Sequence, residues 1–208
     1  HIMSPKWVRQ PEARPRQILA AALEEFSRRG YRGATMEGIA RAAGVTKGTI
    51  YLYFAGKQAL FIATLRAQVK ALADLLPGLR MEAEADLGAY ARTMAARFLE
   101  LLMTPSMAKA APLFIAEINH MPALRRAYLE EWMPQFSMTL ATALDKAMAA
   151  GVIRRLDPVI TARILMGMFT IFVLTQEVFD AKSVTPMRLE DIAETIATIF
   201  LEGVRNAR

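Results

Sequence analysis

The stretch from Thr35 to Phe54 constrains the fold more than any other part of this sequence. Two short apolar helix patterns flank Gly44, a residue that tolerates the positive φ of a tight turn. Thr35 and Thr46 each precede one of these patterns and can cap a helix. Two short helices joined in this way cross steeply, and the small Ala40 permits their close approach. The pattern predicts a helix-turn-helix whose wedge is filled by Ile39, Val45 and Ile50.

A longer amphipathic helix precedes this motif, from about Arg14 to Gly30. Its apolar residues recur at Ile18, Ala22 and Phe26, and Gly30 is expected to end it. The second helix is expected to bury Met36, Ile39, Ala40 and Ala43. The third, expected over Lys47 to Phe54 with Ile50 and Phe54 inward, turns outward Thr46, Lys47, Thr49, Tyr51 and Tyr53.

Hydroxyls, a cation and aromatic rings suit a helix that lies in the major groove of DNA. No acidic residue occurs between Gly38 and Gln58, so nothing within that stretch repels phosphate. The segment therefore favours a DNA-binding role, and an ordinary three-helix packing unit is the alternative.

The net charge of +6 is confined to the first quarter of the chain. Residues 1–57 hold 10 Lys and Arg against 4 Asp and Glu, whereas residues 58–208 hold 16 of each kind. This asymmetry indicates either a polyanionic partner (nucleic acid or an anionic membrane) or a basic solvated face. Five arginines add phosphate contacts if they face a duplex: Arg14, Arg16, Arg29, Arg32 and Arg41.

Residues 16–60 resemble the DNA-binding domain of the TetR/AcrR regulators. Two departures, Ala55-Gly56 and Gln58, lie outside the recognition helix. The matching residues are Ile18-Leu19-Ala20-Ala21-Ala22, Phe26, Gly30-Tyr31, Ala34-Thr35, Ile39-Ala40, Ala43-Gly44-Val45, Lys47-Gly48-Thr49-Ile50-Tyr51, Tyr53-Phe54 and Lys57.

The resemblance implies a role for individual residues. Thr35 and Lys57 meet phosphates, the first at a helix N-terminus. Gly48 lets the backbone approach the duplex closely, and Tyr31 packs mainly in the core. The DNA-binding residues implied are Thr35, Thr46, Lys47, Gly48, Thr49, Tyr51, Tyr53 and Lys57, and their partner is a palindromic double-stranded operator.

The fold class expected is all-α, with an N-terminal three-helix DNA-binding domain followed by a C-terminal helical bundle for ligand binding and dimerisation. Residues 1–13 are interpreted as a tag remnant and flexible basic arm, residues 14–57 as the DNA-binding domain and residues 58–208 as the bundle. Pro134 should kink or break its helix, and Asp157-Pro158 is a helix start signal. The helices expected in the bundle are 57–76, 87–103, 107–120, 122–150, 158–180 and 186–205, with an acidic loop at 79–86.

The helix expected at 158–180 is apolar around nearly its whole circumference, so it should be buried on all sides. Its apolar run between Arg163 and Glu177 has 13 residues, fewer than the ~20 that span a membrane. The resemblance implies that this helix and the last one form a four-helix interface with a second copy, and burial within one chain is the alternative. The dimer-interface residues are Ile164, Met168, Phe172, Ile192, Ile196 and Ile199.

Methionine and aromatic residues between Met94 and Met138 lie where the resemblance implies a ligand cavity. Such side chains can repack around a guest, but an ordinary core has the same pattern. Residues 117–169 are also similar to AefR-like C-terminal domains. The ligand-binding residues predicted are Met94, Phe98, Leu102, Phe114, Glu117, Ile118, Trp132, Phe136 and Met168, for a small hydrophobic or aromatic effector.

Two His, no Cys and no phosphate-loop, nucleophile-elbow or zinc-protease motif argue against an enzyme. We expect no catalytic residues, no metal and no cofactor. The cytoplasm is expected because Cys is absent and no apolar signal segment follows the first basic residues. The sequence thus predicts a homodimeric repressor released from its operator by the effector, without membrane contact. The alternatives are an activator or partner-responsive regulator of the same fold, and a helical carrier of hydrophobic molecules.

Overall fold

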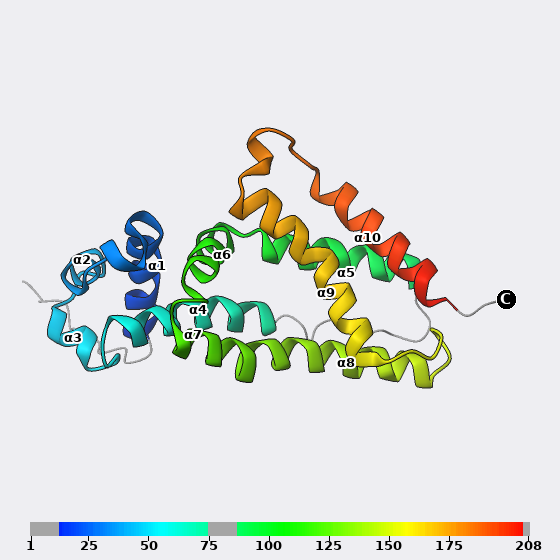
Figure 1. Ribbon diagram of the computed structural model, residues 1–208, viewed down its shortest axis with the longest axis horizontal. Coiled ribbons are helices and arrows are strands. Elements are labelled where there is room, and N and C mark those ends of the chain that lie inside the picture. Colours follow the sequence, from blue (N-terminus) through cyan, green and yellow to red (C-terminus); the bar gives the residue numbers. More distant parts are fainter. Residues whose placement is uncertain (1–12, 75–86, 206–208) are drawn as a thin grey trace, which may run out of the picture. The chain divides into compact units, whose positions relative to one another are not determined.

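The computed structural model describes residues 13–74 and 87–205, and every regular element in these ranges is helical (Figure 1). The expected flexible arm, the end of the helix at 74–76 and the acidic loop at 79–86 lie wholly or largely outside the described residues. The chain divides into two compact units, residues 1–67 and 68–208. The first unit therefore includes ten residues that the sequence analysis gave to the second domain.

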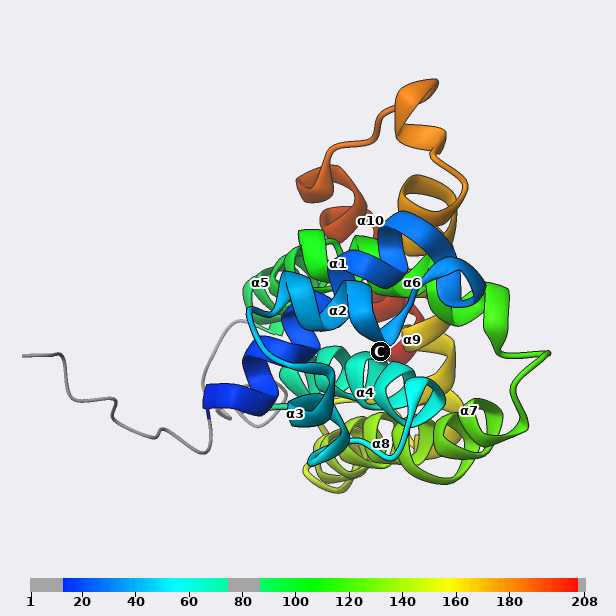
Figure 2. The same ribbon diagram turned by 90° about the vertical axis from the view of Figure 1, so that its left-hand side faces the viewer.

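The first unit contains α1 (Ala13–Gly33), α2 (Met36–Ala42), α3 (Lys47–Tyr51) and the beginning of α4 (Lys57–Ala73), which Figure 2 shows face on. Gly30 and Gly44 both have positive φ, so each redirects the chain where the sequence predicts a turn. Gly30 has a non-helical backbone and kinks α1 there, and a short helical stretch follows as far as Gly33. The third helix ends at Tyr51 rather than Phe54, and Phe54 is only half-buried.

Three aromatic rings hold this unit together. Phe26 of α1 meets Phe61 of α4 edge to face, with ring centroids 4.9 Å apart, and Tyr31 lies 4.9 Å from the same Phe61 ring. The predicted core role of Tyr31 is confirmed. Ile18 of α1, Ile39 of α2 and Ile50 of α3 are completely buried in the same unit. Burial of these side chains supplies most of the stability of so small a unit.

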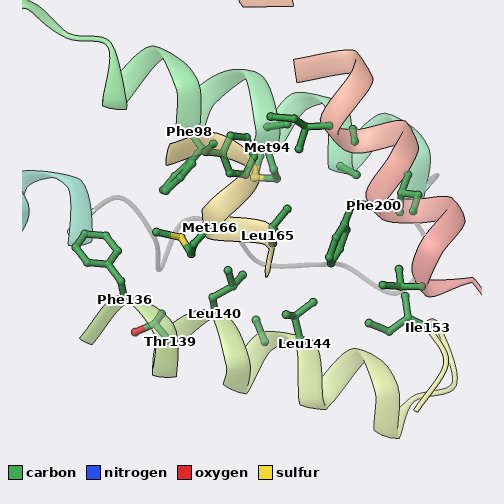
Figure 3. A pocket seen from close by; sticks show the side chains of 18 residues that line it. Met94, Phe98, Phe136, Thr139, Leu140, Leu144, Ile153, Leu165, Met166 and Phe200 are labelled. Carbon is green, nitrogen blue, oxygen red and sulfur yellow. The ribbon is translucent and has the colours of Figure 1, made fainter. Parts of the chain in front are cut away.

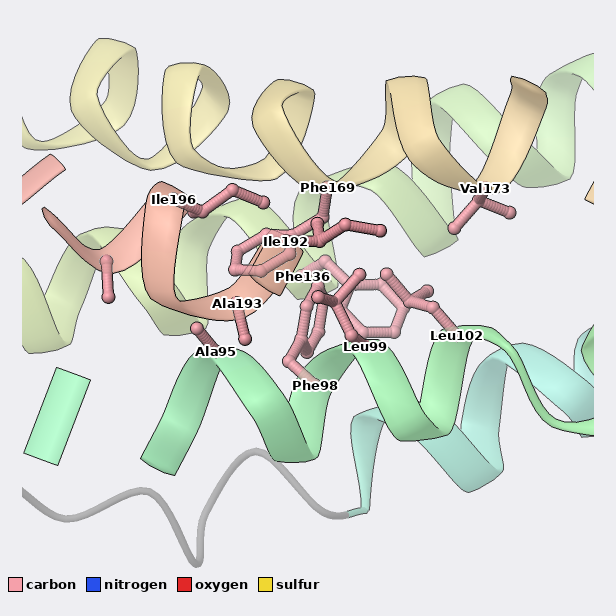
Figure 4. Packing of buried hydrophobic residues seen from close by; sticks show 11 residues of the cluster. Ala95, Phe98, Leu99, Leu102, Phe136, Phe169, Val173, Ile192, Ala193 and Ile196 are labelled. Atoms are coloured by element: carbon pink, nitrogen blue, oxygen red, sulfur yellow. The ribbon is translucent and has the colours of Figure 1, made fainter. Parts of the chain in front are cut away.

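The second unit pairs its long helices. Helix α5 (Leu87–Leu102) packs against α10 (Leu189–Val204), and α8 (Met133–Ala149) packs against α9 (Pro158–Val173). Figure 4 shows the apolar cluster that joins α5, α9 and α10, in which the rings of Phe98 and Phe169 lie 4.9 Å apart. The predicted helix start at Asp157 is confirmed, because its carboxylate accepts a hydrogen bond of 2.8 Å from Ile160 N.

Shorter elements fill the rest of the second unit. Helix α6 (Pro105–Glu117) begins two residues earlier than expected, because Thr104 caps it and Pro105 occupies its first turn. The helix predicted to kink or break at Pro134 does not end there, because a π-helical turn interrupts it just before Pro134 and the chain stays helical. Helix α7 (Pro122–Ala127) gives way to a π-helical turn at Tyr128–Trp132 before α8 begins, and Pro134 lies in the first turn of α8. A second π-helical turn (Leu174–Val178) extends α9, and a 3₁₀ turn (Ala181–Ser183) follows.

The alternative interpretation of α9, burial within one chain, does not hold, since Ile160, Ile164 and Ile171 are 59%, 59% and 51% exposed. The assignment of two residues of α10 to the dimer interface does not hold either. Ile192 and Ile196, assigned to a dimer interface, are only 4% and 3% exposed because they pack against α5. Helix α10 is apolar on two sides, and the sequence could not tell which side faces its own chain.

By length and composition, Pro158–Val178 could cross a membrane, as could the bent pair α5 and α6 taken as one span. The stretch Pro158–Val178 is longer than the 13-residue apolar run of the sequence, because the helix extends beyond both Arg163 and Glu177. The exposed isoleucines of α9 all lie within it.

Candidate nucleic-acid interface and apolar cavity

Helix α3 presents a polar, exposed N-terminus. Thr46 caps it by accepting a hydrogen bond of 3.1 Å from Thr49 N, and the two threonine hydroxyls lie 2.8 Å apart. Thr46, Lys47 and Gly48 are exposed, as are Tyr51 and Tyr53, whereas Thr49 is half-buried. The outward set predicted from the sequence is thus brought together on one short helix and the turn after it.

Leu52, which the sequence analysis did not single out, is 82% exposed between the two outward tyrosines. An isolated exposed leucine has no periodic signal, so its position between Tyr51 and Tyr53 was the only clue. An apolar side chain here can contact thymine methyl groups.

Lys47, the first residue of α3, forms an ion pair with Glu37 in the first turn of α2. Its ammonium also lies 5.9 Å from the centroid of the Tyr51 ring. The hydrogen bond between Lys47 and Glu37 lowers the pKa of the Glu37 carboxyl and raises the pKa of Lys47. Glu37 directly precedes the acid-free stretch that begins at Gly38, and no local pattern in the sequence indicates that it pairs with Lys47.

Thr35 caps α2 as predicted, accepting a hydrogen bond of 3.0 Å from Gly38 N. Behind this turn lies Glu25 of α1, whose side chain is only 4% exposed and pairs with Arg28 and, at 2.9 Å, with Arg29. The Arg29 guanidinium is thus neutralised from within the chain. The buried carboxylate lies beside the N-terminal turn of α2, where a helix favours negative charge.

Lys57 lies where the sequence predicts, at the start of α4, but its ammonium is directed into the chain. It donates hydrogen bonds to the carbonyl oxygens of Arg32 (3.1 Å) and Ala34 (2.8 Å), and it lies 4.8 Å from the centroid of the Tyr31 ring. These contacts join α4 to the corner between α1 and α2. The Lys57 side chain was expected to point toward a DNA phosphate, but in this structure it points toward the backbone of its own chain.

The second unit contains a partly open apolar cavity of about 160 Å³ between α5, α8, α9 and α10 (Figure 3). Three of the predicted ligand-binding residues line it: Met94 and Phe98 from α5, and Phe136 from α8. Among the described residues that line this cavity, Thr139 is the only one with a polar side chain. The cavity therefore suits a neutral, apolar guest.

Six predicted ligand-binding residues do not line this cavity. Leu102 belongs to the buried core cluster, while Met168 packs against that cluster from α9. Phe114 lies 5.0 Å from the ring of Tyr128 and 6.3 Å from that of Trp132 in a separate aromatic group. Glu117 and Ile118 are half-buried near the end of α6. The other lining residues, which the prediction omitted, include Leu140, Leu144, Ile153, Leu165, Met166 and Phe200.

An apolar stripe runs along the outer side of α9. Ile160, Ile164, Gly167 and Ile171 are exposed and recur at intervals of four and three residues, as on one face of a helix. A Cβ built on Gly167 would meet nothing within 4 Å, so the face is open at its centre. On α10, Ile199 is also exposed. No group of three His, Asp or Glu side chains that could hold a metal occurs in the described parts of the chain.

Known proteins match the chain along nearly its whole length. The family described as bacterial regulatory proteins of the tetR family matches residues 18–64, and the AefR-like transcriptional repressor C-terminal domain matches residues 92–203. The HTH-type transcriptional regulator YhgD of Bacillus subtilis strain 168 is 26% identical over 92% of this chain and 96% of its own length.

Two solved structures show the same fold. A TetR-family transcriptional regulator from Mesorhizobium loti MAFF303099 is 25% identical, with a TM-score of 0.80 over 96% of this chain and 100% of that one. FadR of Bacillus subtilis, solved in complex with stearoyl-CoA, is 22% identical, with a TM-score of 0.74 over 91% of this chain and 99% of that one. The chain belongs to the TetR family of DNA-binding transcriptional regulators and carries a C-terminal domain of the AefR-like type.

Proposed function

We propose that this protein is a cytoplasmic, homodimeric repressor that leaves a palindromic operator when a neutral apolar molecule enters the cavity of its second unit. The observation that carries the DNA-binding part is the exposed, capped N-terminus of α3. Thr46, Lys47 and Gly48 lie at the first turn, where a recognition helix contacts base edges, and Tyr51 and Tyr53 flank them on the same side.

Two copies of α3 are needed to read a palindrome, because one short helix makes too few base contacts. TetR-family regulators are typically dimeric. The exposed stripe of Ile160, Ile164 and Ile171 on α9, together with Ile199 on α10, supplies the self-complementary apolar surface that a two-fold interface requires. Met168 and Phe172, predicted for this interface, are half-buried beside the stripe.

The cavity supports a small apolar effector. An engineered cavity of about 150 Å³, lined by leucine, isoleucine and phenylalanine, stays dry and binds benzene. This cavity has a similar volume and a similar lining. A guest of that size, or the hydrocarbon part of a larger one, would fill it. A charged molecule would lose its hydration without gaining a partner, since Thr139 alone lines the cavity with a polar group.

Helix α4 is the element through which the two sites are coupled in this proposal. It is one continuous helix, in which Phe61 belongs to the core of the first unit and Val69 packs against the core cluster of the second. A guest that shifts the second core changes the direction of α4, and the two recognition helices then leave their spacing of about 34–36 Å. The coupling equals the difference in the guest's affinity for the two states.

The experiment begins by selecting an operator from a random duplex library with the purified protein. Toluene and 1-hexanol are then titrated into the complex while DNA release is followed by fluorescence anisotropy. We expect both compounds to weaken operator binding, and the operator to weaken their binding by the same factor. Selection of no sequence would contradict sequence-specific DNA binding.

A matched pair of variants locates the effector site. Leu140→Trp enlarges a half-buried side chain that lines the cavity from α8, whereas Ala149→Trp adds the same ring at an exposed position on that helix away from the lining. Compound-induced release should disappear in the first variant and persist in the second. Release that survives Leu140→Trp would place the effector elsewhere.

A further inference from the structure

Lys47 occupies a position that folding alone does not favour. It is the first residue of α3, where the aligned peptide dipoles present their positive end and a cation is unfavourable. Glu37, in the first turn of α2, has the opposite sign and is favoured there. The two side chains are both largely exposed, yet they are brought together across the turn of the helix-turn-helix.

Among the residues that the structure describes, Glu37 is the one acidic side chain that pairs with the recognition helix. Glu37 accepts a hydrogen bond from the Lys47 ammonium, which Tyr51 also approaches with its ring. A cation held in this way has to leave a carboxylate before it can meet DNA.

We propose that Glu37 is a specificity-determining residue, which holds the Lys47 ammonium and so suppresses binding to DNA of arbitrary sequence. The inference rests on the proposed contact of Lys47 with DNA. A free lysine that neutralises a phosphate releases one condensed counterion, which makes the slope of log K against log salt steeper by about 0.9. When Lys47 leaves Glu37, the exposed carboxylate takes up a cation, and the net release is close to zero.

Binding to DNA of arbitrary sequence depends on counterion release. Its affinity is therefore lowered most when Glu37 takes up a cation as Lys47 leaves it. A lysine that donates to the O6 and N7 atoms of guanine gains a directed contact that does not depend on released ions. The pair therefore penalises a phosphate contact by Lys47 more than a base contact, and the ratio of operator affinity to random-duplex affinity rises.

The test measures affinity for a random-sequence duplex by fluorescence anisotropy over a series of salt concentrations. Glu37→Gln should bind this duplex more tightly, with a slope steeper by about 0.9 for each protomer that engages. Its preference for a selected operator over the random duplex should fall. Glu24→Gln, which removes the same charge from α1, is the matched control and should not show the steeper slope.

Lys47→Gln and the double variant complete the cycle. In the Lys47→Gln background, Glu37→Gln should no longer steepen the slope of log K against log salt, because the Lys47 ammonium that it would free is absent. An increment that persists there would overturn the pair mechanism and make Glu37 a general repulsive charge. If Lys47→Gln leaves DNA binding unchanged, the proposed contact of Lys47 fails and this inference with it. If Lys47→Gln weakens binding but Glu37→Gln changes neither slope nor preference, only this inference fails.

Discussion

Gly38 of α2 lies so close to the buried carboxylate of Glu25 on α1 that a Cβ at Gly38 would be 2.6 Å from Glu25 Oε1. The same added Cβ would be 3.1 Å from Thr35 Oγ1. The carboxylate cannot move aside freely, because it is held by Arg28 and Arg29. The absence of a side chain at Gly38 is therefore what allows α1 and α2 to pack at this distance.

Gly38→Ala should destabilise the protein for this reason. Crowding in a packed region costs about 1–3 kcal/mol, and the better helix propensity of alanine offsets up to about 1 kcal/mol of it. We expect a net loss of about 1–2 kcal/mol in urea unfolding followed by circular dichroism. Gly48→Ala is the control, since its nearest neighbour, Thr46 Oγ1, would be 3.8 Å away. Equal stability of the two variants would show that Glu25 relaxes without cost.

Lys57→Ala should lower stability rather than change the ionic component of DNA binding. The ammonium donates to two backbone carbonyls and covers the Tyr31 ring, so its removal should cost about 1–2 kcal/mol. Lys70→Ala, on the same helix, removes only an exposed pair with Asp74 and should cost less than about 0.5 kcal/mol. The slope of log K against log salt should stay unchanged in Lys57→Ala. A slope that became shallower by about 0.9 for each protomer that engages would instead establish the phosphate contact implied by the family resemblance.

Two isoleucines separate dimerisation from folding. Ile164→Glu places a charge on the exposed stripe of α9, so it should yield a folded monomer with weak operator affinity. Ile196→Glu places the charge in the core between α5 and α10, so it should unfold the second unit. Sedimentation velocity and thermal unfolding distinguish the two results. A stable Ile164→Glu dimer would contradict the proposed interface.

The ion pair between Glu37 and Lys47 should be insensitive to pH near neutrality. Pairing lowers the pKa of Glu37, so the charge on Glu37 is lost only as the pH falls through that lowered value. Pairing raises the pKa of Lys47, so its charge is lost only as the pH rises through that raised value. Between about pH 6 and pH 9, the affinity difference between Glu37→Gln and the parent protein should stay constant. A difference that changes over this interval would mean that another titrating group controls Lys47.

Local signals made the first unit predictable. Thr35, Thr46 and Gly44 act within one turn of their own position, so caps and the positive-φ turn could be identified before any packing was known. The pairing of Glu37 with Lys47 was not predictable in this way. It depends on the angle between two helices, which no local pattern specifies.

The cavity was only partly predictable, for the same physical reason. Phe136 could be identified because its own neighbourhood is rich in adaptable apolar residues. Phe200 and Ile153 line the cavity because α10 and the chain before α9 approach α8 in three dimensions. Ile196 was predicted for the dimer interface but lies in the core of its own chain. Its apolar side chain could pack against a second copy or against α5, and only the three-dimensional packing distinguishes the two.

The π-helical turn at Tyr128–Trp132 carries a consequence for how the length of the chain can vary. Such a turn holds one residue more than an α-helical turn, so it corresponds to a single-residue insertion within a continuous helix. Deleting one residue there would let this turn close as ordinary α-helix, and the helix after it would keep its rotational phase. Phe136, Leu140 and Leu144 would then still face the cavity, whereas the same deletion within α8 would rotate the residues after it by about 100°. Natural variants should therefore lose a residue more readily between Tyr128 and Trp132 than within α8.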